Sequence, residues 1–357
     1  MWTDNTGEAI MQFGIFSHIP WPEGSDPKTL IDQMIAQSIY GEELGYDSVW
    51  LAEHHFSRYG LSSSSLIIAG SIAARTENIR IGTAVIVPTL HNPIRLAEDT
   101  ATLDVISGGR LDIGYGRGAA SYEYSGYTVD QSTSQQRFQE AIKMVEGIWT
   151  TSEYTYSGDF YSAYKTNLVP KPLQDPHPPV YIGASRTLET LQFVASTGHC
   201  LCVGVVLDTP DALDLVHRFD ALSKESGYSV PTQKIPFFRY CYVAETEKQA
   251  IEDTEHALNW TLDVGQWRAS FKESSEVNHD LKDWLKNRRE NPPSYDYLLH
   301  NRAVIGTPEQ CINQIKSLEQ QGIGYFGCNF FFGDMDHSKV MNSMKLFAEE
   351  VIPAFNS

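Results

Sequence analysis

The sequence predicts an α/β protein built on a (β/α)8 barrel, the TIM-barrel arrangement, with insertions at the carboxyl-terminal mouth of the barrel. Three observations lead to this prediction. Apolar, strand-like runs alternate with helical patterns along the whole chain, as expected of repeated βαβ units in a parallel sheet. Eight such runs occur, and the 357 residues exceed the roughly 250 that a bare barrel needs.

The predicted strands and helices follow one another in order. Each strand is a short apolar run, and each helix carries apolar residues three or four positions apart, as Leu30, Met34 and Ile35 do before the glycine cap at Gly45. The predicted strands are Gln12 to Ser17, Ser48 to Ala52, Ile79 to Val87, Arg110 to Tyr115, Val180 to Ala184, Cys200 to Val206, Ile235 to Ala244 and Tyr325 to Phe332. The predicted helices are Lys28 to Leu44, Ser64 to Arg75, Pro93 to Ser107, Ser134 to Trp149, Leu188 to Ser196, Asp211 to Ser226 and Pro308 to Gln321.

Two segments interrupt this alternation. Residues 153–178 are rich in aromatic residues and prolines, which indicates a hairpin and loop excursion. Residues 247–302 are mostly polar and are interpreted as helices plus a mobile, lid-like loop over the barrel mouth. Residues 1–10 are interpreted as an N-terminal extension, so that residues 11–357 form a single domain.

A doubly wound open sheet is the competing fold, because the alternation of strands and helices does not distinguish a closed sheet from an open one. The number of strands favours the barrel. The absence of Gly-x-Gly-x-x-Gly after the first predicted strand favours it as well.

Composition argues against several kinds of partner. A formal net charge of -18 without a long acidic run disfavours nucleic acid and anionic lipid. No stretch approaches the roughly 18 apolar residues of a membrane span. The five cysteines are an odd number without a Cys-x-x-Cys pair, which fits a reducing, cytoplasmic location.

The second predicted strand is followed by Glu53-His54-His55-Phe56. Residues that follow the strands of a parallel barrel line its active site, and imidazoles with a carboxylate can exchange protons near neutral pH. Two other interpretations remain. A buried histidine can simply satisfy a polar neighbour, and zinc could bind here with further ligands from His18, His91 and His199. Adjacent histidines on an extended backbone point in opposite directions, which disfavours a metal site.

Two more strand ends carry groups suited to an anion. Arg117 lies within Gly114-Tyr115-Gly116-Arg117-Gly118, where small residues allow close approach and the guanidinium suits a phosphate. A predicted helix start after the fifth strand offers free N–H groups, together with Ser185, Arg186, Thr187 and Thr190. A solvated arginine and ordinary N-capping would explain these residues without any ligand.

The third predicted strand ends in Gly82 to Pro88, a small and mostly apolar surface on which a flat ring could lie. Barrel core explains the same residues. Tyr115 and Tyr122 add phenolic groups near the predicted mouth, where they could contact a substrate or simply pack.

Together these segments resemble the bacterial luciferase-like flavin-dependent monooxygenases of the FMN-using branch. The order and spacing of the shared segments hold over nearly the whole chain. The matching segments are Phe13-Gly14-Ile15-Phe16, Gly45 to Phe56, Ile81-Gly82-Thr83-Ala84, Arg95 to Asp99, Leu103-Asp104, Ser107 to Leu111, Gly116-Arg117-Gly118, Val180-Tyr181-Ile182-Gly183 and Gly306-Thr307-Pro308-Glu309.

The resemblance implies a barrel enzyme that takes up reduced FMN (FMNH2) from a separate flavin reductase and forms a flavin C4a-peroxide with O2. This intermediate would oxygenate a small, largely apolar carbonyl or aromatic substrate. The protein would orient the flavin ring and exclude water. A homodimer formed through the first helices is also implied.

The resemblance further implies roles for individual residues. His54 matches the catalytic histidine, with Glu53 and His55 holding its tautomer and orientation. The Ala84-Val85 junction matches the place where relatives often carry a cis peptide bond against the flavin ring. The residues expected to hold the FMN phosphate are Arg117, Ser185, Arg186, Thr187 and Thr190.

This chain departs from the light-emitting enzyme at Gly116, where that enzyme has a reactive cysteine, so bioluminescence with a long-chain aldehyde is not expected. Two alternatives remain: hydride transfer with a deazaflavin coenzyme, and a non-catalytic flavin-binding subunit. Glu53-His54-His55-Phe56 suits the FMN branch better, and the intact His54 argues against the subunit.

Overall fold

The computed structural model describes residues 10–184, 187–273 and 294–356, together with residues 277, 282, 283, 286 and 290. Within these residues, nine parallel strands form one sheet in the order β10-β9-β11-β1-β2-β3-β4-β7-β8. The strands are β1 (Gln12–Ser17), β2 (Ser48–Leu51), β3 (Arg80–Thr83), β4 (Leu111–Gly116), β7 (Val180–Gly183), β8 (Cys200–Cys202), β9 (Phe237–Val243), β10 (Ala303–Gly306) and β11 (Tyr325–Asn329).

The sheet closes between β8 and β9. Val203 and Phe237 form a parallel bridge. The N–H of Val203 donates to the carbonyl of Pro236, and the N–H of Phe238 donates to the carbonyl of Val203, both at 2.9 Å. The predicted barrel is therefore confirmed, and the open-sheet alternative is wrong.

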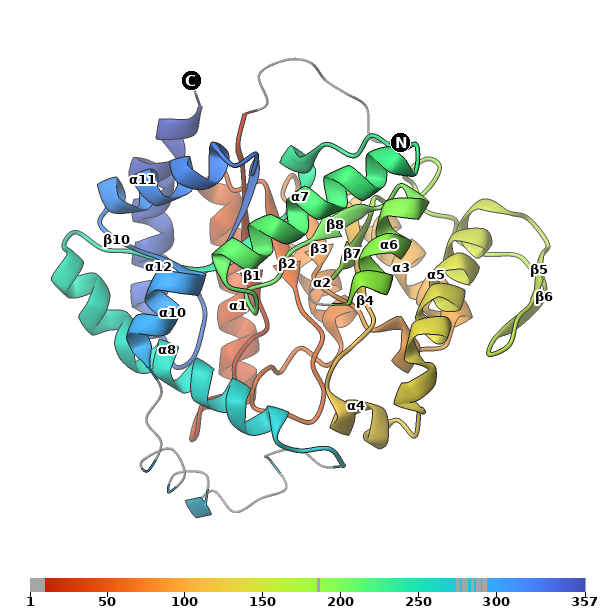
Figure 1. Ribbon diagram of the computed structural model, residues 1–357, viewed down its shortest axis with the longest axis horizontal. Helices are drawn as coiled ribbons and strands as arrows, with labels where there is room; N and C mark the ends of the chain where they lie inside the picture. The colour runs from red at the N-terminus through yellow and green to blue at the C-terminus, as the bar shows by residue number, and fades with distance from the viewer. Residues whose placement is uncertain are drawn as a thin grey trace.

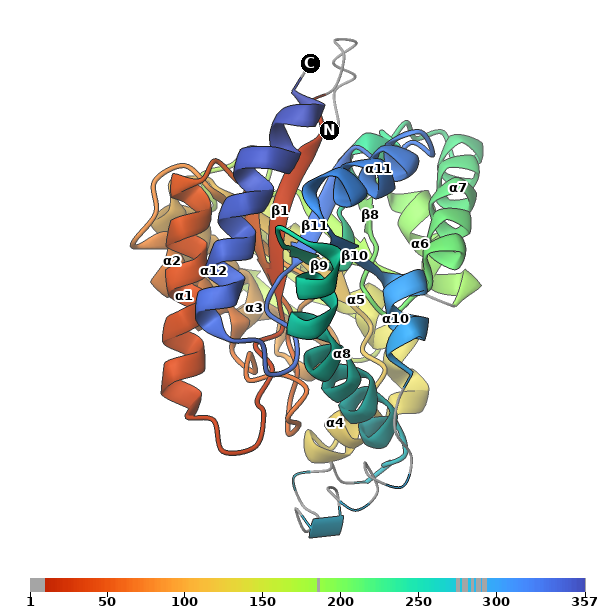
Figure 2. The same cartoon turned by 90° about the vertical axis from the view of Figure 1, so that its left-hand side faces the viewer.

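Helices cover the outside of the sheet (Figure 1, Figure 2). Asp26, Asn92 and Thr307 cap three of them through side-chain oxygens, each followed by a proline in the first turn. The helices are α1 (Pro27–Glu43), α2 (Ser65–Ala73), α3 (Pro93–Ser107), α4 (Ser121–Gly126), α5 (Ser134–Thr150), α6 (Leu188–Thr197), α7 (Thr209–Glu225), α8 (Glu247–Ala269), α10 (Tyr295–Arg302), α11 (Pro308–Glu319) and α12 (His337–Leu346). Because helices cover the outer face and side chains fill the barrel, strands such as β9 are buried along their whole length.

The two ends of the barrel differ in what they carry. In Figure 2 the start of β1 lies at the top, whereas α4 and the carboxyl-terminal part of α8 lie at the bottom. The strands are parallel, so the bottom is the end where their carboxyl termini gather. This is the end of a barrel at which active sites form.

Several elements differ from the sequence prediction. β3 ends at Thr83 rather than Val87, and Ile86 returns to the sheet only as an isolated bridge to Tyr115. The predicted sixth strand is also shorter, since β8 ends at Cys202. The sequence did not predict α4, α12 or β10, and β10 begins directly after the predicted lid segment.

The two predicted insertions contain regular structure. Within residues 153–178, β5 (Tyr154–Ser157) and β6 (Ser162–Thr166) form an antiparallel hairpin that projects beside α5 (Figure 1). Within residues 247–302 lie the long helix α8 and the short helix α10. Most of the segment between these helices, and residues 1–9 of the predicted extension, lie outside the described residues. In the described part of the chain, no helix has the length and apolar character needed to cross a membrane.

Candidate active site

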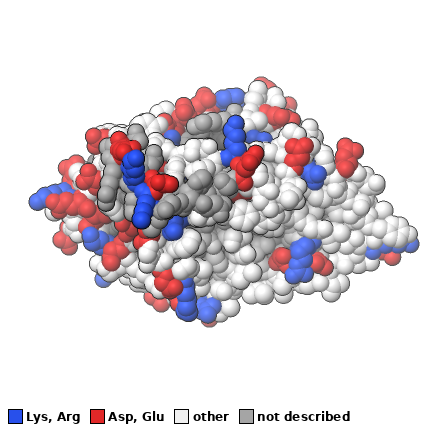
Figure 3. All heavy atoms as spheres, turned by 90° about the horizontal axis from the view of Figure 1, so that it is seen from below, with Lys and Arg blue, Asp and Glu red and all other residues white. Residues whose placement is uncertain are grey.

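A cavity of about 280 Å³ lies among the carboxyl ends of the strands. Figure 3 views the molecule from this end, where charged side chains of both signs are scattered and much of the face carries none. Seven of the residues predicted to form the site line this cavity: Glu53, His54, Ala84, Val85, Arg117, Thr187 and Thr190. The structure therefore brings together residues that are up to 137 positions apart, from Glu53 to Thr190.

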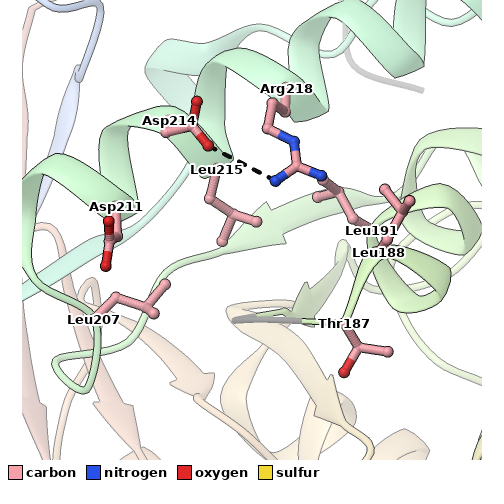
Figure 4. Close-up of a pocket in the computed structure, with 8 residues that line it drawn as sticks. All are labelled: Thr187, Leu188, Leu191, Leu207, Asp211, Asp214, Leu215 and Arg218. Carbon is pink, nitrogen blue, oxygen red and sulfur yellow. Dashed lines mark ion pairs between the residues drawn. The ribbon is translucent and has the colours of Figure 1, made fainter.

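A second cavity of about 220 Å³ lies between α6 and α7 (Figure 4). Leucines and an ion pair of 3.7 Å between Asp214 and Arg218 line it, and its only residue shared with the first cavity is Thr187. Its lining contains no histidine or cysteine, so the first cavity is the candidate active site.

Glu53 is buried between two imidazoles. Its Oε1 lies 2.9 Å from Nε2 of His55 and 2.9 Å from Nε2 of His91. Burial raises the pKa of Glu53, but the hydrogen bonds with His55 and His91 outweigh burial, so the pKa is lowered. Burial lowers the pKa of His91, but Glu53 outweighs it and the pKa is raised. Glu53 is therefore a carboxylate at neutral pH, and it favours the protonated form of His91.

His54 faces a different carboxylate. Its Nδ1 lies 3.6 Å from Oε1 of Glu123, and the same oxygen accepts the backbone N–H of His55 at 3.1 Å. Burial lowers the pKa of His54, and Arg268 lowers it further, whereas Glu123 raises it; the net shift is downward. His54 is therefore a neutral imidazole near pH 7, able to accept a proton.

The orientation of the two histidines corrects one expectation. Glu53 and His55 were expected to orient His54, but Glu53 binds His55 and His91 instead. The group that faces His54 is Glu123, on the short helix α4. Glu123 was not predicted as a site residue, because α4 itself was not predicted.

The opposite end of the cavity carries Arg117 and the start of α6. Arg117 donates from Nη1 to Oγ of Ser134 at 3.2 Å. Thr190 donates from Oγ1 to Oε1 of Gln135, the residue after Ser134, at 3.2 Å. Both groups are thus anchored at the start of α5. In the described part of the chain Arg117 forms no ion pair, so its charge is available to an anion.

A flat, apolar wall joins these two ends. The Ala84–Val85 peptide bond is cis, as the resemblance implies, and both residues line the cavity. Val85 is packed against two glycines of the neighbouring strands: a Cβ added to Gly116 would lie 2.3 Å from its Cγ2, and one added to Gly183 would lie 3.1 Å from its Cγ1. A side chain at Gly116 would therefore displace Val85, and one at Gly183 would press against it.

These observations fit FMN. The cationic end, with hydroxyls and a helix start, suits a phosphate, the Val85 wall suits a flat ring, and the imidazole at the far end suits proton exchange. Ser185 and Arg186, which were also predicted to bind the phosphate, lie outside the described residues.

Tyr115 and Tyr122 do not line the cavity. Tyr115 lies in the barrel core with its side chain fully buried, and Tyr122 is buried on α4. This placement does not support their prediction as substrate contacts, because successive side chains along β4 alternate between the two faces of the sheet and Tyr115 is fully buried.

Besides Glu123, the cavity residues that were not predicted as parts of the site include His18, Tyr59 and Arg268. His18 follows β1, Tyr59 follows the two histidines, and Arg268 is in the last turn of α8. His18 could have been found from its place after a strand, where the sequence suggested only a metal ligand. The described residues contain no group of three or more histidines, cysteines or carboxylates arranged to hold a metal ion.

A parallel barrel whose mouth holds histidines, carboxylates and an arginine around one cavity is typical of an enzyme. Comparison with known proteins identifies the family. The chain belongs to the luciferase-like monooxygenases, whose family profile matches residues 11–324.

A curated relative is the oxygenase component of a flavin-dependent trigonelline monooxygenase from Acinetobacter baylyi, which is 28% identical over 354 residues, 97% of this chain and 96% of that protein. Among solved structures, monooxygenase RslO1 from Streptomyces bottropensis has a TM-score of 0.81 at 24% identity, covering 96% of this chain and 99% of its own.

Two further structures share the fold. The oxygenating constituent of 3,6-diketocamphane monooxygenase from Pseudomonas putida, in complex with FMN, has a TM-score of 0.77 at 18% identity and covers 96% of this chain and 98% of its own. An F420-dependent secondary alcohol dehydrogenase has a TM-score of 0.74 at 20% identity and covers 98% of this chain and 100% of its own.

Proposed function

We propose that this protein is the oxygenase component of a two-component monooxygenase. It takes FMNH2 from a separate flavin reductase and uses O2 to oxygenate a small, largely apolar carbonyl or aromatic compound. The observation that carries the proposal is a single cavity lined by Arg117 and Thr190, by the cis Ala84–Val85 segment and by His54.

The residues that line the cavity have different roles in the proposed reaction. Arg117, Thr187 and Thr190 bind the phosphate. Val85 supports the ring, and the apolar lining excludes water. Bound FMNH2 would supply the electrons that activate O2. His54, neutral near pH 7, takes up or returns a proton beside the ring, and Glu123, whose Oε1 lies 3.6 Å from Nδ1, stabilises the protonated form.

The relatives support this proposal in part. The A. baylyi relative is an oxygenase component, which implies a reductase partner for that protein.

The five cysteines of this chain are all free and buried, in keeping with the proposed cytoplasmic location. The alternative is hydride transfer with deazaflavin, favoured by the fold shared with an F420-dependent dehydrogenase.

Coenzyme titration separates the two functions. Under anaerobic conditions the protein is expected to bind FMNH2 more tightly than reduced F420. Arg117→Ala is expected to weaken binding of FMN while leaving the phosphate-free riboflavin unaffected. Tighter binding of F420 would favour the hydride-transfer alternative.

Rapid mixing with O2 then tests the oxygenase step. Flavin bound to the wild-type protein is expected to reoxidise more slowly than free FMNH2, with less hydrogen peroxide formed, and His54→Ala is expected to lose this difference. Reoxidation at the rate of free flavin in the wild type would show that the proposed function is wrong.

A further inference from the structure

The candidate active site contains a second arginine that the proposed steps do not use. Arg268 is in the last turn of α8, whose end lies beside α4 at the mouth of the barrel (Figure 2). This position is held by Oγ of Ser125 on α4, which donates to the carbonyl of Lys272 at 3.2 Å. Arg268 lines the cavity.

The guanidinium of Arg268 is fixed on one face only. Its Cζ lies 4.1 Å from the centre of the Tyr59 ring, a cation–π contact. Its Nη1 is buried and has no hydrogen-bond partner among the described residues. A buried N–H group without an acceptor destabilises the folded protein. An oxygen atom of a bound ligand could supply the acceptor that Nη1 lacks.

The neighbouring groups do not supply that partner. Neither ring nitrogen of His18, which stacks on Tyr59 with ring centres 4.5 Å apart, is hydrogen-bonded within the described part of the chain. Glu123 is the carboxylate at this end, and its charge acts on Arg268, but its Oε1 accepts from the backbone of His55 and faces His54.

Arg268 and Arg117 serve different parts of the cavity. Arg117 is anchored to α5 beside Thr190, whereas Arg268 is packed against Tyr59, which follows β2. In the sheet, β3 and β4 separate β2 from β7, the strand that leads to α6. A flavin phosphate bound at Arg117 would therefore leave Arg268 without an anionic partner.

We propose that Arg268 binds the carboxylate of the organic substrate, so that the substrates are small aromatic or heteroaromatic acids. The planar guanidinium fits a carboxylate through two parallel hydrogen bonds, and an aromatic body suits the apolar residues Phe16 and Phe238 that line the cavity. His18, which stacks on the same Tyr59 ring and also lines the cavity, is available for a further hydrogen bond. This inference rests on the proposed function for the place of the flavin.

Calorimetric titration of the cofactor-free protein tests the inference. The probes are benzoate, phenylacetate, nicotinate and picolinate, each paired with its neutral amide. At least one acid is expected to bind more tightly than its amide. In Arg268→Gln the affinity for that acid is expected to fall about tenfold to a hundredfold, as for the loss of a hydrogen bond to a charged group, while the amide is unaffected. Arg268→Lys is expected to restore part of the loss.

Arg58→Gln is the matched control. Arg58 also stacks over an aromatic ring, with its Cζ 4.4 Å from the centre of Trp21, but it does not line the cavity. Equal losses in the two variants, a preference for amides, or no binding by any acid would overturn the inference. FMNH2 binding is measured in parallel. If the protein binds FMNH2 normally but does not prefer acids, only the Arg268 inference is wrong. If it prefers acids through Arg268 but does not bind FMNH2, only the proposed function is wrong.

Discussion

Glu53 illustrates how single residues at this site are coupled through charge. It is buried, and His91 and His55 both lie within hydrogen-bonding distance. Replacing His91 by Gln removes the group whose raised pKa makes it the cationic partner of Glu53. The expected cost is about 1–3 kcal/mol in the free energy of unfolding, because a buried carboxylate loses a charged partner.

This cost is expected to depend on pH. The pKa of His91 is raised in the folded protein, so its stabilising effect is complete below its ordinary pKa of about 6.5 and is lost as pH rises through the raised value. The pKa of Glu53 is lowered, so its contribution is lost only as pH falls through the lowered value. Urea unfolding of wild type and His91→Gln should differ most near about pH 5.5–6.5 and less near about pH 9. A difference that grows with pH would contradict the pairing.

Glu123 is expected to control the proton affinity of His54. Its carboxylate raises the pKa of His54 against the stronger effect of burial, so Glu123→Gln should lower that pKa further. Titration of the His54 ring by NMR checks the shift, and the acid limb of the pH–rate profile should move to lower pH with it. Glu98→Gln, an exposed change on α3, is the control. An unchanged His54 titration in Glu123→Gln would show that the 3.6 Å contact has no electrostatic effect.

At the scale of elements, the ends of β3, β4 and β7 shape the flavin wall together. Gly116→Ala would place a Cβ 2.3 Å from Cγ2 of Val85, and the stiff, β-branched side chain must move. FMN affinity is therefore expected to fall at least about tenfold, a loss of about 1.4 kcal/mol, in a fluorescence titration.

Gly70→Ala provides the control for Gly116→Ala. Gly70 is in α2, where an added Cβ meets nothing within 4 Å, so this change should leave FMN binding unchanged and stabilise the helix by up to about 1 kcal/mol. Equal FMN affinity in Gly116→Ala and wild type would show that the Val85 wall does not contact the flavin.

The elements that the sequence predicted well are those with strong periodicity. Helices α1, α3 and α5 and strands β1, β4 and β9 were found within a few residues, because their buried faces repeat at the helical or strand interval. β3 was predicted too long, since Ile86 and Val87 continue the apolar run after Thr83. Helix α4 has only six residues and no periodic apolar face, so it could not be predicted from the sequence. The contact between Glu123 and His54 was missed for the same reason.

At the scale of the whole molecule, closure of the barrel makes the site. The sequence could place His54, Val85, Arg117 and Thr190 after strands, and closure brings them into one cavity. Arg268 could not be predicted, because it does not directly follow a strand: it lies in the last turn of the long helix α8, whose end is held near α4 by the hydrogen bond from Ser125 to Lys272. Residues that directly follow strands can thus be predicted from the sequence, whereas residues far along a helix require the structure.

The surface of the first helices supports a dimer as a further expectation. Ile67 on α2 is 73% exposed and Ile106 on α3 is 52% exposed, and these neighbouring helices pack together. Large apolar side chains gathered on neighbouring helices are typical of an interface, and we expect the partner to be a second copy of the chain. Ile67→Glu combined with Ile106→Glu should shift the protein from dimer to monomer in light scattering, because a dimer would bury the two new charges. Val169→Glu, at a position 84% exposed on the loop after β6, should leave the mass unchanged. A monomeric wild type, or a double variant that remains dimeric, would show that α2 and α3 do not form the interface.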